Sequence, residues 1–165
     1  MLQKPHLFAA LFLASALLHA QRVYVVDQTG GLGTDFRDLI SAVNGVRDGD
    51  VLRVRRGAYM LPPAILKGIT ILGENEPVLV GSGFNSFAAL AYNKTLVVRR
   101  CRIAIGLSGL QVLGCQGRVH FDEVIIGSLA FDSLNIVDCR TVTLNRCTVV
   151  GQTAGAVAVG GSSNV

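Results

Sequence analysis

The chain has 165 residues, half of them hydrophobic and 16% charged, with a formal net charge of +4. This length fits one domain with a sizeable core. The 15 basic residues are interspersed with 11 acidic ones and form no block of like charge, which argues against a nucleic-acid partner.

Residues 1–20 have the features of a secretory signal peptide. Lys4 supplies a positive start, residues 7–18 are apolar apart from Ser15, and Ala20 ends a segment suited to cleavage. This apolar run is too short to cross a bilayer core of about 30 Å. The alternative is an uncleaved anchor. We expect cleavage and a mature protein without a membrane span that is secreted, periplasmic or bound at the cell surface.

Residues 21–50 are predicted to form a strand, a glycine-rich loop and a capping helix. Apolar residues at helical spacing predict the helix over residues 36–46, with Thr34 or Asp35 as the N-cap. Strand, Gly-x-Gly and helix also occur in this order at nucleotide sites. Here the third glycine is missing and an acidic residue lies where phosphate would bind. We therefore expect the helix to cover the open end of the strands that follow.

A six-residue motif recurs from residue 96 onward: apolar, any, apolar, any, any, cysteine. It begins at Leu96, Leu110, Leu134 and Val142, and at Val119 without the cysteine. The starts form two interleaved series with steps of 23 and 24 residues, and a third series of short segments ends in glycine. Three short strands per repeat of this size predict an all-β solenoid, a single-stranded parallel β-helix over residues 51–165 with about 23–24 residues per coil.

Side chains alternate along a strand, so the first and third places of the motif should face the interior. The predicted interior columns are Leu96, Val119, Val142; Val98, Phe121, Leu144; Leu110, Leu134; and Val112, Ile136. The fourth and fifth places form two further columns, Arg99, Asp122, Asn145 and Arg100, Glu123, Arg146. Opposite charges across neighbouring strands contribute roughly 0.2–1 kcal/mol per pair, so these columns support the same register.

These charged columns also supply the candidate binding residues, which are Arg99, Arg100, Asp122, Glu123 and Arg146. The expected ligand is an acidic polysaccharide or another cell-surface component. The alternative is a solvated surface with no ligand, which is the commoner role of exposed charge.

No metal or cofactor is expected, because the four cysteines form no Cys-x-x-Cys pair and have no histidine at ligand spacing. All four occupy the sixth place of the motif, where Val124 replaces one, so we expect free interior thiols. The alternative is a disulfide between Cys115 and Cys139, which should lie on neighbouring coils.

The first coils carry a recognisable set of motifs. The capping helix is followed by Gly49–Val54, Gly57–Tyr59 and Lys67–Gly73. This order resembles the opening of right-handed parallel β-helix proteins of the pectin lyase-like superfamily, and the resemblance covers residues 22–80. It implies the fold, because the superfamily includes lyases, hydrolases, esterases, epimerases, adhesins and inert repeat domains.

Catalytic residues of that superfamily cannot be carried over, and the catalytic residues stay unknown. For example, His120 stands where the resembling esterase segment has its aspartate, and the outward second places carry no carboxylate. We expect a non-catalytic repeat domain that is structural or binds polysaccharide weakly. The alternative is the N-terminal part of a polysaccharide lyase or glycoside hydrolase.

The C-terminal end suggests an unfinished solenoid. A strand is expected from Ala156, and Val165 falls where the next strand of the 96, 119, 142 series should begin. No capping segment follows, and an uncapped solenoid exposes its core. We expect missing coils and self-association through this end.

Overall fold

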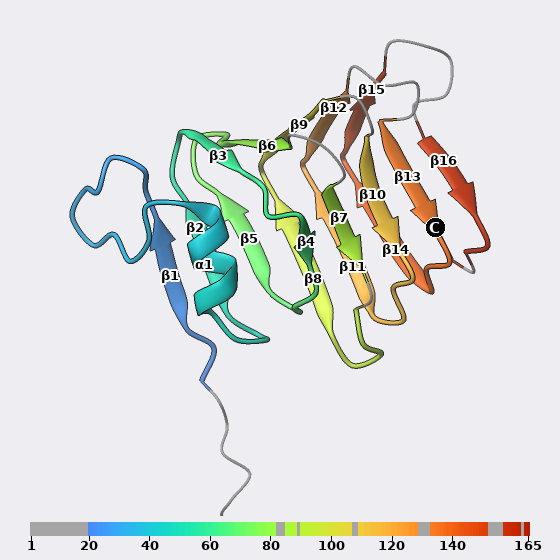
Figure 1. Cartoon of the computed structure of the whole chain (residues 1–165), viewed down its shortest axis with the longest axis horizontal. Coiled ribbons are helices and arrows are strands. Elements are labelled where there is room, and N and C mark those ends of the chain that lie inside the picture. The colour runs from blue at the N-terminus through green and yellow to red at the C-terminus, as the bar shows by residue number, and fades with distance from the viewer. Residues whose placement is uncertain are drawn as a thin grey trace, which may run out of the picture.

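The computed structural model describes residues 20–81, 85–88, 90–106, 109–128, 133–151, 157–162 and 164–165. They form a parallel β-solenoid of about four turns with one short helix near the N-terminus, as predicted (Figure 1). Within these ranges no helix is long and apolar enough to cross a membrane. The predicted signal peptide lies outside the described residues, apart from Ala20.

Three parallel sheets make the sides of the solenoid. Sheet A contains β1 (Val23–Val26), β2 (Val51–Val54), β5 (Thr70–Gly73), β8 (Thr95–Arg99), β11 (Arg118–Asp122) and β14 (Thr141–Asn145). Sheet B contains β3 (Ala58–Met60), β6 (Val78–Gly81), β9 (Arg102–Ile105), β12 (Ile125–Ser128) and β15 (Thr148–Val150). Sheet C contains β4 (Ala64–Ile65), β7 (Asn85–Ala88), β10 (Leu110–Leu113), β13 (Leu134–Val137) and β16 (Val157–Gly160). Each coil therefore contributes one strand to each sheet.

The predicted interior columns are confirmed in register. Val119 pairs with Leu96 and Val142, and Phe121 pairs with Val98 and Leu144. In sheet C, the first and third places of β10 likewise pair with those of β13. These side chains are buried except for Leu144, which is half-buried. The stacked apolar columns are the core that holds the coils together.

Aromatic stacking joins two sheets inside the solenoid. Phe121 of sheet A and Phe87 of sheet C lie with ring centroids 5.7 Å apart and nearly parallel, and both are almost fully buried. The strand that carries Phe87 was not predicted, because β7 begins with two polar residues, Asn85 and Ser86, and so lacks the apolar first place of the motif.

The capping helix is shorter than predicted. Helix α1 covers Leu39–Gly45, and its N-cap is Asp38, whose carboxylate accepts a hydrogen bond from Ser41 N. The N-cap prediction of Thr34 or Asp35 is wrong because Asp35 has a different partner, the backbone N–H of Val25 at 2.8 Å.

Lysine 67 holds the other end of the helix. Its Nζ donates to the carbonyls of Val43, Asn44 and Val46 at 2.7–2.8 Å. These carbonyls have no partner within the helix, and the negative end of the helix dipole favours a cation there. The first coils thus fix the helix over the core, where Leu39 and Val43 are buried.

The last strand is displaced by one residue from its prediction. Val157, rather than Ala156, pairs with Leu134, so the step between these coils is 23 residues. One coil further, Val142 N donates to Asn164 O at 2.9 Å, which brings Val165 into register with Val142 as expected. Residues 164–165 form no strand.

The fifth place of the motif has a left-handed backbone conformation in every coil. Its residues have φ between 51° and 60°, namely Arg100, Gly114, Glu123, Asp138 and Arg146. This conformation turns the chain between two sheets, and it is costly for residues other than glycine. The fifth place is therefore a corner position as well as a position for charge.

This conformation predicts the effect of substitutions at Arg100. We expect Arg100→Val to be less stable than Arg100→Gly by about 1–2 kcal/mol, because a β-branched side chain clashes most with a left-handed backbone. Urea unfolding of the two variants measures the difference. Equal stability would show that this corner tolerates the strain.

Three of the four thiols are interior, as predicted. The structure has four free cysteines, of which Cys101, Cys115 and Cys139 are buried and Cys147 is half-buried. Burial raises the pKa of Cys101 to about 12 and that of Cys115 to about 11. The thiol of Cys139 donates to Val112 O at 3.2 Å, on the preceding coil. Such thiols are poor nucleophiles at neutral pH.

Candidate functional site

Four of the five predicted binding residues form one network of ion pairs. Asp122 lies 2.7 Å from Arg99 and 3.0 Å from Arg146, and Glu123 lies 2.9 Å from Arg146. Asn145 also donates to Asp122, at 2.7 Å. Arg100 forms none of these ion pairs. Neighbouring coils therefore neutralise both acids, which supports a structural role for them.

The network also decides the protonation of Asp122. The hydrogen bonds that Arg146 and Arg99 donate hold the pKa of this carboxyl below its usual value. A general acid at neutral pH needs the opposite shift. Asp122 is thus suited to hold charge in place rather than to donate a proton.

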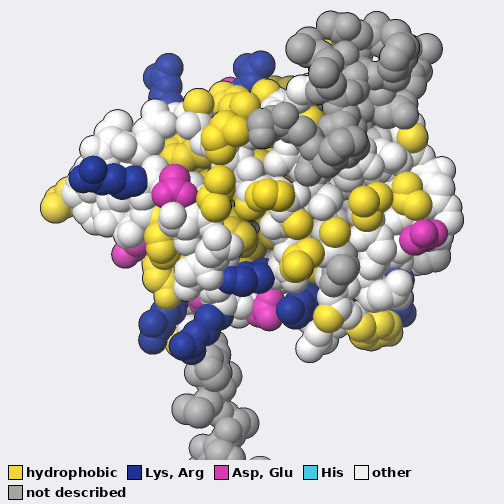
Figure 2. Space-filling model, in the orientation of Figure 1, with side chains coloured by type: hydrophobic (Ala, Val, Ile, Leu, Met, Phe, Trp, Pro, Cys, Tyr) yellow, Lys and Arg dark blue, Asp and Glu magenta, His cyan; other side chains and the backbone are white. Residues whose placement is uncertain are grey.

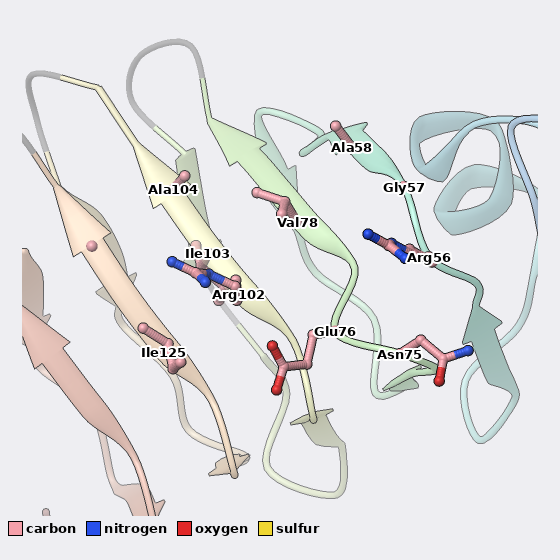
Figure 3. Close-up of a pocket in the computed structure, with 11 residues that line it drawn as sticks. Arg56, Gly57, Ala58, Asn75, Glu76, Val78, Arg102, Ile103, Ala104 and Ile125 are labelled. Carbon is pink, nitrogen blue, oxygen red and sulfur yellow. The ribbon is translucent and has the colours of Figure 1, made fainter.

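Two adjoining hollows form a groove beside this corner, along the outer face of sheet B. The larger has a volume of about 720 Å³ and the smaller about 480 Å³, and both are lined by Asn75, Glu76, Arg102 and Ile125. The lining of the larger hollow includes the small side chains of Ala58 and Val78, which pair in register with each other and with Arg102. Figure 3 shows Arg56 and Arg102 on either side of Val78.

The groove contains more uncompensated positive than negative charge. Of its acids, Glu74 is paired with Arg53 and Glu123 with Arg146. Within the described part of the chain, no ion pair involves the remaining charged groups of the groove, which are Arg56, Arg100, Arg102 and Glu76. Three arginines against one glutamate favour an anionic ligand.

Two of these residues extend the predicted fifth-place column. The strands of sheet B pair in register at Ala58, Val78, Arg102, Ile125 and Thr148. Two positions before each of these stands a charged residue, namely Arg56, Glu76, Arg100, Glu123 and Arg146. The alternation of charge thus runs beside all five strands of sheet B. The first coils lack the six-residue motif, so Arg56 and Glu76 were not predicted as members of this column.

Arg102 was missed for another reason. It opens β9, in which Arg102 and Ala104 are exposed while Ile103 and Ile105 are buried. This alternation was visible in the sequence and predicts an outward arginine. Nothing in the sequence placed it opposite Arg56, since that depends on the stacking of coils.

A metal site needs a set of ligand side chains that lie close together. Residues 20–81 and the described segments beyond them contain no group of three His, Cys, Asp or Glu side chains able to hold a metal ion.

Comparison with known proteins gives no further identification. No family model, no curated protein and no solved structure matches this chain. The parallel β-solenoid is therefore established by the structure, and membership of the pectin lyase-like superfamily remains a prediction.

Proposed function

We propose that this chain is an exported, non-catalytic β-helix domain that binds an acidic polysaccharide along the outer face of sheet B. The observation that carries the proposal is that, among the described residues of the groove, three arginines without an ion pair (Arg56, Arg100 and Arg102) outnumber one such acid, Glu76. Arginine presents a planar fork that matches a carboxylate. Successive coils stack about 4.8 Å apart. The groove therefore offers side chains at a regular spacing along the solenoid, as an extended polysaccharide offers sugar units at a regular spacing.

The alternative is the N-terminal part of a polysaccharide lyase or glycoside hydrolase. Hydrolysis of this kind needs a carboxyl whose pKa is raised. Among the described residues, hydrogen bonds lower the pKa of Asp27 to about 2 and that of Asp122 below its usual value. These shifts favour the binding function.

Binding of polygalacturonate tests the proposal. We expect Arg56→Gln/Arg102→Gln to weaken binding about tenfold or more, because charge-assisted hydrogen bonds are the strong ones. Isothermal titration calorimetry at low salt measures this loss. The control Arg22→Gln/Arg47→Gln removes the same charge from residues outside the groove.

An equal loss in both double variants would overturn the groove as the site. Neutral dextran should not bind to the unaltered protein. Release of unsaturated products from polygalacturonate with calcium, abolished by changing Asp122, would contradict the non-catalytic assignment and favour the lyase.

A further inference from the structure

A second polar hollow lies at the other edge of sheet A, where the chain passes from sheet C to sheet A. Its volume is about 420 Å³, and its lining residues include Tyr92, Asn93, Gln116, Arg118, Arg140 and Thr141. No lining residue is Asp or Glu. Figure 2 shows several Lys and Arg side chains, with acidic side chains among them, along the lower edge of this face. The hollow differs from the groove on sheet B, which contains acids.

Stacking of coils places donor groups side by side in this hollow. Arg118 pairs with Thr95 on one neighbouring coil and with Thr141 on the other. The hydrogen bond from Val142 N to Asn164 O places Asn164 next in the same column. A guanidinium, two hydroxyls and an amide thus form a strip with about 4.8 Å between successive members.

Within the described part of the chain, these donors have no internal acceptor. Among the described residues, none accepts a hydrogen bond from the side chain of Asn93, Gln116, Arg118 or Thr141. Arg118 is exposed and has no ion pair with a described residue. A ligand with several acceptor oxygens can therefore replace water here without breaking an internal contact.

An aromatic ring borders the donors. Tyr92 is 68% exposed, and the guanidinium of Arg140 lies 4.1 Å from the centroid of its ring. This cation–π contact holds the ring in position at the mouth of the hollow. The exposed remainder of the ring is an apolar surface that suits the C–H face of a sugar.

The turn that carries Tyr92 is fixed against the next coil. Lys94 N donates to Ala91 O at 2.9 Å. A Cβ atom added at Gly117 would meet the carbonyl oxygens of Ala91 and Lys94, so the turn packs closely on this glycine. The site is therefore preformed, and binding does not have to order the turn.

We propose that this corner binds a sugar that carries a sulfate or phosphate ester. Arg118 and the hydroxyl and amide donors on either side of it receive the ester oxygens, and Tyr92 contacts the sugar ring. The donors come from several coils and lie along one strip, so the strip offers more than two donors, which suits an oxyanion with three free oxygens better than a carboxylate with two. The inference does not depend on the groove of sheet B.

Binding of four monosaccharides tests the site. The probes are glucose 6-phosphate, glucose 6-sulfate, glucuronate and glucose, followed by amide chemical shifts in NMR titrations. We expect one or both esters to bind at least tenfold more tightly than glucuronate, and glucose not to bind. The two esters separate a phosphate site from a sulfate site.

Two variants locate the binding. Arg118→Gln should weaken ester binding about tenfold or more, and Tyr92→Ala should weaken the sugar ester more than inorganic phosphate. Both residues are exposed, and an unchanged melting temperature checks their folding. Arg22→Gln/Arg47→Gln is the control, because neither residue lines this hollow or the groove of sheet B, and it should leave ester binding unchanged. Equal binding of glucuronate and the esters, or unchanged binding in Arg118→Gln, would overturn the inference.

Discussion

Replacing Phe121 by alanine is expected to lower the free energy of unfolding by about 3–5 kcal/mol. Phe121 is fully buried and lies at the centre of its column, between Val98 and Leu144. The substitution removes the stack with Phe87 and leaves a cavity that the rigid coils on either side cannot close. Thermal or urea unfolding measures the loss.

Leu144 provides a matched control for Phe121. It occupies the same column one coil further and is only half-buried. Leu144→Ala should therefore cost clearly less than Phe121→Ala, because part of its surface is already in water. Equal costs would mean that the coil carrying Leu144 is covered in solution.

Replacing Gly73 by alanine is expected to cost about 3 kcal/mol, at the upper end for overpacking. Gly73 is buried at the end of β5. An added Cβ would overlap the backbone carbonyl of Arg100 on the next coil and lie 2.8 Å from Pro77 Cδ. Backbone cannot rotate away as a side chain can, so the two coils must separate. Urea unfolding measures the cost.

Gly127 is the control for this clash. It lies in β12, and an added Cβ there meets no atom within 4 Å. Gly127→Ala should leave the stability unchanged or raise it by up to about 1 kcal/mol, through the lower entropy of the unfolded chain. A similar loss for both glycines would show that the effect comes from strand glycines in general.

The two experiments test different contacts between different pairs of coils. Phe121 tests the apolar interior, where the sequence pattern is strong. Gly73 tests the corner, where the backbone of one coil touches the next. Loss of stability at either position would also reduce ligand binding, so the binding variants should first be checked for folding.

The six-residue motif was sufficient to predict the interior. Every predicted column is in register in the structure, because alternation along a strand and a fixed repeat length determine which residues stack. The motif is absent from the first coils, and it failed where its first place is polar, as in β7, and where the repeat length changes by one, as before Val157.

The corner geometry was not predictable from the motif. The sequence suggested that Arg100, Glu123 and Arg146 face each other as a simple charge ladder. In the structure only Glu123 and Arg146 of these three form an ion pair, although all three have the same left-handed backbone conformation. Asp122 pairs with arginines on both sides instead.

The sequence by itself determined the parallel β-solenoid, its period and its interior columns, since these depend on local alternation and on hydrophobic burial. Only the tertiary structure decided which charges are compensated and which face a groove. Arg56 and Arg102 are 46 positions apart in the sequence, and so are Thr95 and Thr141. Each pair is brought to the same side of the solenoid by the rise per coil and by the corner conformations. Neither of these is encoded within a single repeat.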